Sequence, residues 1–360
     1  MNEIKIQDKE EPPSSEEPPG CKNWHWQFKH RLTYNDLIQR GIEVPKTNFP
    51  VAITPYYFSL IKKYDDSDPI FKMCIPQEDE LTLLNSDPLC EDSMSPVSCL
   101  VHRYRDRALI ISTTTCATYC RYCTRKRKVG IQHHTITLSE LHKITEYLSN
   151  HQEVSDVIIS GGDPLTFETD KLEKIISVIR DVPSVEIIRI GTKVPVVMPM
   201  RINKKLVKML KQYQPIFVNT HFNHPQEITR DSKMACAKLI DHGIPIGNQS
   251  VLLKGINDDK HIQEELCRKL IRMRVKPYYL YQCDLIDGVE HFRTKVSKGI
   301  EIMEHLRGQI SGMAIPQFVI DSPGGKGKIP IIPTYLISQS PEKVVLRNYK
   351  GELVEYPEVS

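Results

Sequence analysis

The sequence predicts an α/β fold in which a parallel sheet curls into a partial or complete barrel. Seven short runs rich in Ile, Val and aromatic residues follow one another after Arg107, at residues 108–113, 156–160, 185–190, 215–220, 244–250, 277–281 and 316–321. Amphipathic helical patterns lie between most of these runs, for example at 139–150, 170–181, 203–213 and 233–243. Strands that alternate with helices pair in parallel, and six or seven such units can curl a sheet. An open doubly wound sheet is the competing architecture, but no Gly-x-Gly-x-x-Gly motif follows the first strand.

Four segments follow one another along the chain. Residues 1–20 hold four prolines and eight charged residues, which predicts a disordered or loosely packed tail. Residues 21–100 show helical spacing interrupted by prolines, which indicates a small helical lobe. The barrel core is expected at 101–330, and residues 331–360 form a short C-terminal extension.

The composition shows no nucleic-acid or membrane signature. The 360 residues suffice for a full core, and 48 Lys and Arg against 45 Asp and Glu give a formal net charge of +3. No apolar run approaches the roughly 18 residues of a membrane span, and the first residues lack a hydrophobic signal core. The predicted location is the cytoplasm, where the ten cysteines are expected to serve metals or catalysis.

Three cysteines, Cys116, Cys120 and Cys123, follow the first predicted strand in a C-x3-C-x2-C arrangement. Three thiolates on one loop can reach three corners of an iron-sulfur cube and leave one iron open for another ligand. A zinc site is the alternative, but structural zinc usually takes four protein ligands in paired C-x2-C units. The motif resembles that of the radical S-adenosylmethionine (SAM) superfamily. That resemblance implies a partial (β/α)6-type barrel, a 4Fe-4S cluster on these cysteines, and SAM chelated at the open iron.

A glycine pair ends the second predicted strand in DVIISGGDP, with Gly161, Gly162 and Asp163. Glycines let the backbone approach a ligand closely, and a carboxylate can accept a bond from an ammonium group. An ordinary structural turn has the same pattern. The superfamily resemblance implies contact of this segment with the SAM methionine amine, and a further SAM contact at Gln249.

The run DSPGGKGKIP places Lys326 and Lys328 among three glycines after the last predicted strand. A lysine there can reach into a pocket, although a solvated basic turn fits as well. With HRYRDRALI, VNTHFNHPQEIT, GNQSVLLKGIND and YYLYQCDLIDGVEHFRTKVSKGIEI, the chain resembles the lysine 2,3-aminomutases from about residue 24 to residue 351. In that family the final lysine of PGGGGK carries pyridoxal 5'-phosphate (PLP), which implies Lys328. Lys326 occupies the fourth glycine position.

The same resemblance assigns further cofactor contacts to Arg103, Tyr104 and Tyr281. An arginine can hold a phosphate through two hydrogen bonds, and an aromatic ring can cover the pyridine ring. Ordinary barrel packing of the tyrosines is the alternative.

The substrate implied by the resemblance is lysine, converted to β-lysine (3,6-diaminohexanoate) by a 5'-deoxyadenosyl radical. Asp284 and Asp321 match the two acids that receive the ε-ammonium, and Arg125 matches the arginine that receives the α-carboxylate. Rival activities are an aminomutase acting on arginine and one forming (R)-β-lysine for a translation factor. A non-catalytic iron-sulfur or zinc module is the rival of another class.

Two departures from the family pattern concern zinc. The C-terminal tail RNYKGELVEYPEVS has no cysteine, and Asp259 stands at the family's zinc-ligand cysteine in GINDD. Zinc is therefore not expected as a cofactor of this protein. Tyr122 replaces a histidine commonly found between the second and third cysteines.

The expected partners are an electron donor such as flavodoxin or ferredoxin and further copies of the chain, in a homodimer or higher homo-oligomer.

Overall fold

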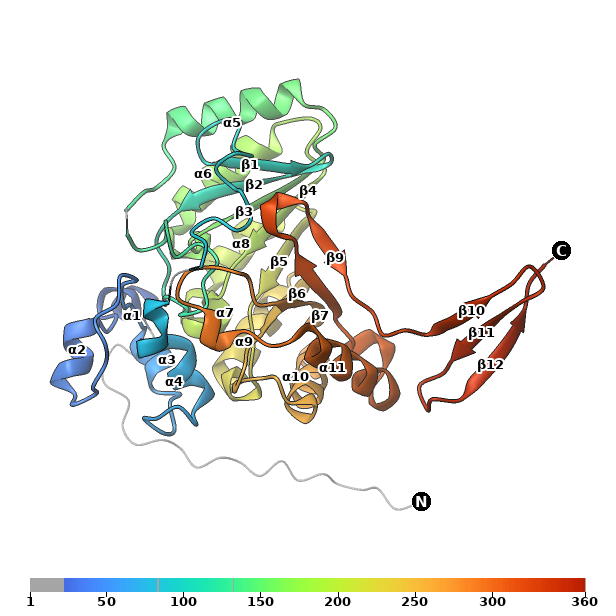
Figure 1. Cartoon of the computed structure of the whole chain (residues 1–360). Coiled ribbons are helices and arrows are strands. Elements are labelled where there is room, and N and C mark those ends of the chain that lie inside the picture. Colours follow the sequence, from blue (N-terminus) through green and yellow to red (C-terminus); the bar gives the residue numbers. More distant parts are fainter. Residues whose placement is uncertain (1–22, 83, 132, 360) are drawn as a thin grey trace, which may run out of the picture.

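The computed structural model describes residues 23–82, 84–131 and 133–359, and within them a nine-stranded sheet forms the centre of the molecule (Figure 1). The sheet curls, and its spatial order follows the chain from β1 to β9. The strands are β1 (Leu100–Tyr104), β2 (Arg107–Thr113), β3 (Asp156–Gly161), β4 (Ile187–Gly191), β5 (Ile216–Thr220), β6 (Ile246–Leu252), β7 (Lys276–Gln282), β8 (Gln317–Asp321) and β9 (Lys328–Pro330).

Strands β2 to β8 pair in parallel, and they coincide with the seven runs that the sequence predicts. The edge strands β1 and β9 pair antiparallel to their neighbours and were not predicted. No pairing joins β1 to β9 within the described residues, so the barrel stays open. The prediction of an α/β fold with a partial barrel is confirmed.

Helices connect the parallel strands and lie along the outside of the curve (Figure 1). Helix α6 shows why these helices pack against the sheet. One face of it is apolar, because Leu172, Ile175, Ile176 and Ile179 recur at helical spacing, and all four are buried. The helices are α5 (Leu138–Asn150), α6 (Thr169–Arg180), α7 (Val194–Val197), α8 (Lys204–Gln212), α9 (Arg230–Ile240), α10 (Lys260–Arg272) and α11 (Val296–Gln309). The inner face of the sheet remains available for a site.

The segment before the sheet holds four short helices, α1 (Trp24–Lys29), α2 (Tyr34–Gln39), α3 (Pro55–Phe58) and α4 (Pro69–Cys74). The sequence suggested that prolines interrupt this region, but Pro55 and Pro69 each begin a helix. Thr54 and Asp68 cap these helices through side-chain hydrogen bonds, and proline suits a first helical position because its missing N–H would have no partner there. The predicted tail at residues 1–20 lies outside the described residues.

Short 3-10 helices complete the connections. They are η1 (Glu78–Leu81), η2 (Pro164–Thr166), η3 (Pro199–Arg201), η4 (Pro225–Glu227), η5 (Glu290–Phe292), η6 (Gly312–Ala314) and η7 (Pro323–Gly325). None of the helices in the described part of the chain combines the length and the apolar character that crossing a membrane requires.

The C-terminal residues form a second, three-stranded antiparallel sheet of β10 (Leu336–Gln339), β11 (Lys343–Arg347) and β12 (Leu353–Pro357). We call this sheet the C-terminal arm, and it projects away from the rest of the molecule (Figure 1). All residues of β10 and β12 are exposed.

Candidate active site

The three cysteines lie on the loop that follows β2, and the N-terminal segment holds this loop. The backbone N–H of Tyr119 donates to the carbonyl of Ala52 (2.9 Å), and Nη1 of Arg31 donates to the carbonyl of Cys116 (2.6 Å). Each of the three cysteines is partly buried. The short helices before the sheet therefore help to position the cysteine loop.

A buried ion pair reinforces this contact. Arg121 is fully buried, and its Nε and Nη2 donate to Glu80 of η1 at 2.7 and 2.6 Å. Lys126 donates to the same carboxylate at 3.0 Å, and Lys128 pairs with Asp92 at 2.5 Å. The basic run 125–128 thus pairs with acids of this chain, which argues against a nucleic-acid surface.

The glycine pair after β3 packs against the cysteine loop. A side chain on Gly162 would collide with the backbone of Thr115, one residue before Cys116, and Gly161 adopts φ +110°. The buried carboxylate of Asp163 accepts bonds from Leu165 N (3.0 Å), Thr192 Oγ1 (2.7 Å) and Lys193 N (2.8 Å). These residues therefore tie the ends of β2, β3 and β4 together.

A cavity of about 250 Å³ lies on the inner face of the sheet, close to the lower end of the roughly 300–1,000 Å³ range of small-molecule pockets. Of the residues implied by the family resemblance, seven line it: Arg103, Tyr104, Arg125, Gln249, Tyr281, Asp321 and Lys328. Gly161, Gly162, Asp163, Asp284 and the three cysteines are not among the residues that line this cavity.

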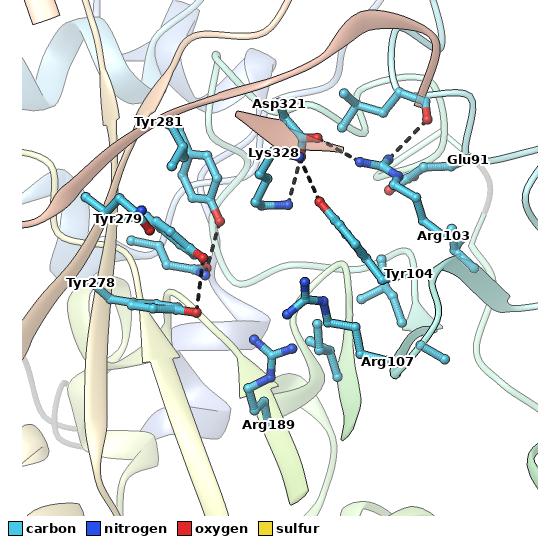
Figure 2. Close-up of a pocket in the computed structure, with 18 of the residues that line it drawn as sticks. Glu91, Arg103, Tyr104, Arg107, Arg189, Tyr278, Tyr279, Tyr281, Asp321 and Lys328 are labelled. Atoms are coloured by element: carbon cyan, nitrogen blue, oxygen red, sulfur yellow. Dashed lines mark hydrogen bonds and ion pairs between the residues drawn. The ribbon is translucent and has the colours of Figure 1, made fainter. Parts of the chain in front are cut away.

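Lys328 begins β9, and its ammonium group lies inside the cavity. Nζ of Lys328 donates to Oδ2 of Asp321 (2.9 Å), and Nη1 of Arg103 donates to Oδ1 of the same carboxylate (2.7 Å) (Figure 2). The Tyr104 hydroxyl accepts from the backbone N–H of Lys328 at 2.8 Å. Asp321 thus bridges an arginine and a lysine. Lys326 is not among the residues that line the cavity.

Tyr281 faces Lys328 across the cavity. Nζ of Lys328 lies 5.7 Å from the Tyr281 ring centre, and Nε2 of Gln249 donates to the Tyr281 hydroxyl (3.3 Å). Burial raises the pKa of Tyr281 well above its ordinary value, so the phenol stays protonated.

The second predicted substrate acid, Asp284, lies close to the cavity. Its Oδ2 accepts from the hydroxyl of Thr124 (2.6 Å), the residue after Cys123. Burial, together with the charge of Asp321, raises the pKa of Asp284 to about 6. Arg125, the next residue, lines the cavity. The cysteine loop and the lysine loop therefore meet at one site.

Glu91 is a site residue that sequence reasoning missed. Nε and Nη2 of Arg125 donate to its carboxylate in a bidentate pair, with a shortest distance of 2.7 Å. Glu91 is buried and lines the cavity. No sequence pattern marks it, because it lies in an irregular segment before β1.

Arg107 and Arg189 are further cavity residues without a prior assignment. Both side chains point into the space between Tyr104 and the tyrosines of β7 (Figure 2). Arg189 donates to Asp156 through Nε (2.8 Å), but its buried Nη2 has no partner among the described residues, and neither has Nε of Arg103. Unpartnered guanidinium nitrogens beside a cavity suit an anionic group such as a phosphate.

Tyr122 lies among the cluster cysteines in a buried network. Its hydroxyl accepts from Nδ2 of Asn223 (2.6 Å) and Nζ of Lys193 (3.0 Å), and it forms a hydrogen bond with Cys120. Burial raises the pKa of Tyr122 well above its ordinary value. The residue that replaces the family histidine is therefore a neutral donor close to Cys120.

Comparisons with known proteins match the families that the sequence motifs of this site resemble. Residues 110–266 match the model of the radical SAM superfamily, and residues 303–360 match a model described as lysine-2,3-aminomutase. Barrel, cysteine loop and superfamily match together define a protein of the radical SAM class.

The relatives narrow this class. L-lysine 2,3-aminomutase of Clostridium subterminale is 48% identical over 349 residues, which cover 93% of this chain and 84% of the relative. The enzyme of the same name from Fusobacterium nucleatum is 51% identical, with 93% and 82% coverage. Glutamate 2,3-aminomutase of Clostridioides difficile is 42% identical, with 92% and 82% coverage. The chain belongs to the L-lysine 2,3-aminomutase family.

Proposed function

We propose that this protein is an isomerase that uses a 4Fe-4S cluster, SAM and PLP to move the amino group of lysine from C2 to C3. The observation that carries the proposal is the meeting of two loops at one cavity. The cysteine loop contributes Thr124 and Arg125, and β9 contributes Lys328, whose ammonium group binds Asp321.

The cysteine loop fits an iron-sulfur cluster. Cys116, Cys120 and Cys123 are partly buried on one loop between the N-terminal segment and the sheet, and three thiolates leave one iron open. With SAM at that iron, the cluster supplies a 5'-deoxyadenosyl radical. We assign Gly161, Gly162, Asp163 and Gln249 to the SAM side of the site.

The cavity fits PLP. Lys328 would bind its aldehyde carbon, and Arg103, Arg107 and Arg189 offer guanidinium nitrogens to its phosphate, two of them buried without partners among the described residues. Tyr104 and Tyr281 bound the same space. When bound, the cofactor supplies a π system that stabilises an unpaired electron during the nitrogen shift.

The acids of the site select a primary ammonium group. Lys328 itself shows that Asp321 accepts an ammonium ion at 2.9 Å, and Asp284 lies near enough to raise the local negative charge. Asp321 pairs with Arg103 on one oxygen and with Lys328 on the other, and attachment of PLP to Lys328 would free the second oxygen for the substrate. The substrate ε-ammonium then balances the remaining carboxylate charge, which a glutamate side chain cannot do.

Arg125 is placed to receive the α-carboxylate. Its guanidinium group has further N–H donors besides the two nitrogens that bind Glu91. Arginine as substrate would present a larger, planar guanidinium group to the two acids, and the parallel assay with arginine separates it from lysine.

The activity is tested with purified, anaerobically reconstituted protein incubated with SAM, PLP and a reductant. Lysine, arginine and glutamate are offered in parallel, and products are separated on a chiral column. We expect β-lysine from lysine alone. Turnover of arginine or glutamate at a rate similar to that of lysine would contradict the assignment of the two acids.

Cofactor attachment has a separate test. Borohydride reduction of the protein with PLP should fix a phosphopyridoxyl group on Lys328, found by peptide mass spectrometry. Lys326→Ala is the matched control and should retain the label, while Lys328→Ala should lose it. A phosphopyridoxyl group found on Lys326 would contradict the assignment of Lys328 and would identify Lys326 as the reactive lysine.

Other properties follow as proposals. The enzyme works in the cytoplasm and takes electrons from a flavodoxin or ferredoxin. Residues 101–330 act as the catalytic core, residues 21–100 as a lobe that supports the cysteine loop, and residues 331–360 as an extension for self-association into a homodimer or larger homo-oligomer. The exposed strands of the C-terminal arm support that last proposal.

A further inference from the structure

A second group of metal-ligating side chains lies outside the cavity, at Cys99, His134 and Glu140. Cys99 immediately precedes β1, His134 lies between the cysteine loop and α5, and Glu140 lies in the first turn of α5. Sγ of Cys99 is 3.2 Å from Nε2 of His134 and 3.5 Å from Oε1 of Glu140. Nε2 of His134 is 3.3 Å from the same Oε1. Three segments of the chain thus bring three donor atoms to one point.

The spacing of the three atoms matches a tetrahedral zinc site. Zinc binds sulfur at about 2.3 Å and nitrogen or oxygen at about 2.0–2.1 Å, which at the tetrahedral angle separates sulfur from either atom by about 3.6 Å and nitrogen from oxygen by about 3.3 Å. The observed separations are 3.2, 3.5 and 3.3 Å. A single ion can therefore reach all three donors with small adjustments.

The arrangement differs from a nucleophile relay. In a relay, one ring nitrogen of the histidine faces the nucleophile and the other faces the carboxylate. Here Nε2 of His134 faces both the sulfur of Cys99 and the carboxylate of Glu140. The sulfur and the carboxylate oxygen both lie at the same nitrogen of His134, as they would around a metal ion that all three atoms bind.

Surrounding contacts hold the donors in place. Oε2 of Glu140 accepts from the backbone N–H and the hydroxyl of Thr137, both at 2.9 Å, and Oε1, which lies beside Cys99 and His134, accepts from the hydroxyl of Ser98 (2.8 Å). The backbone of His134 exchanges two bonds with Thr114, at 2.8 and 3.0 Å. Cys99 adopts φ +65°, a left-handed conformation that costs a non-glycine residue about 1–2 kcal/mol.

We propose that Cys99, His134 and Glu140 bind one zinc ion, with water as the fourth ligand. The His134 side chain is 40% exposed, which gives water access, and one thiolate with one carboxylate neutralises the ion. The site is separate from Asp259, which caps α10 by accepting from the backbone N–H of His261 (2.8 Å). The ion joins β1, α5 and the return of the cysteine loop, because Thr114 lies two residues before Cys116.

Metal content of the full-length protein with its cluster reconstituted tests the site. After incubation with zinc and removal of loosely bound metal, we expect about one zinc ion per chain by mass spectrometry. His134→Asn and Cys99→Ser should each hold less than about a tenth of that amount, while His133→Asn, which removes an exposed neighbouring imidazole, should match wild type. Wild-type protein without zinc, or equal zinc in His134→Asn, would overturn the proposal.

A second experiment distinguishes zinc at this site from zinc at Cys116, Cys120 and Cys123, because these three cysteines can bind zinc when iron is missing. A variant with Cys116→Ala, Cys120→Ala and Cys123→Ala is titrated with cobalt. A thiolate-to-cobalt absorption band should persist in it and vanish after the further change Cys99→Ser. His134→Cys, which keeps a ligand at this position, should retain zinc. Absence of the band from the triple variant would contradict the site.

Discussion

At the scale of single residues, the site is a set of charges that neutralise one another until substrate arrives. Asp321 holds Arg103 and Lys328 on its two oxygens, and Arg125 is paired with Glu91. Buried charges require such partners, because removing one partner costs about 3–5 kcal/mol. Asp284 has a hydroxyl partner and no ion pair among the described residues, and burial raises its pKa to about 6.

The pKa of Asp284 predicts how lysine binding depends on pH. The carboxyl group is neutral below about pH 6 and attracts an ammonium group only above it, so lysine should bind more weakly as the pH falls through that value, by up to about tenfold per unit. Norleucine, which lacks the ε-ammonium, is the matched ligand for calorimetry and should not show this dependence. A constant ratio of lysine to norleucine affinity from about pH 5 to about pH 8 would contradict the role of Asp284.

The pair of Arg125 and Glu91 calls for a double variant. Arg125→Gln alone should weaken lysine binding and also destabilise the protein by up to about 3–5 kcal/mol, because the buried carboxylate of Glu91 then keeps only the longer ion pair with Arg127 (3.9 Å). Arg125→Gln with Glu91→Gln should restore most of the stability but not the affinity. Denaturant unfolding and calorimetry measure the two effects. Recovery of lysine affinity in the double variant would show that Arg125 acts only structurally.

At the scale of secondary-structure elements, the ends of β2, β3 and β4 meet through close backbone contacts. Gly162 packs on Thr115, and Asp163 bridges to Thr192 and Lys193. The N-terminal segment covers the same region through Arg121 and Glu80. The cysteine loop is therefore held from two sides.

Gly162→Ala tests this contact. The added methyl group would overlap the backbone of Thr115, so we expect a loss of about 1–3 kcal/mol in stability and less iron per chain after reconstitution. Gly312→Ala is the control, because no atom lies within 4 Å of a side chain built there. Equal iron content in both variants would show that the loop does not depend on this close packing.

At the scale of the whole molecule, the C-terminal arm is the part that cannot bury its own apolar surface. Leu336, Leu346 and Val354 lie opposite one another across its three strands, and Tyr356 pairs with Val344. Side chains directly opposite in antiparallel strands share one face, so this face is apolar. A three-stranded sheet gains stability by covering such a face, which supports association with another copy.

Val354→Glu tests that association. A buried valine contributes about 1.5–3 kcal/mol, and a glutamate in its place would add a desolvation cost, so the variant should dissociate into smaller species. Leu353→Glu is the control, because Leu353 lies next in the strand and points to the other face. Sedimentation analysis compares the variants. An unchanged assembly in Val354→Glu would exclude this face from the contact.

Sequence reasoning located features that depend on local pattern. Alternating apolar runs predicted all seven parallel strands. The sequence analysis did not predict the edge strands β1 and β9, because Arg103 and Lys328 make them polar and their inner sides face the cavity. The strands of the C-terminal arm were not predicted either, because they are exposed and show no alternation of buried and exposed residues.

The sequence by itself determined the seven parallel strands, the helices between them and the cysteine motif, since each follows from the spacing of neighbouring residues. Only the tertiary structure decided which charges meet: Arg103 and Asp321 are 218 residues apart, and Arg125 and Glu91 are 34 apart. The same holds for Cys99 and His134, 35 residues apart. Local spacing dictates which face of an element is buried, whereas partners of buried polar groups depend on how the chain closes on itself.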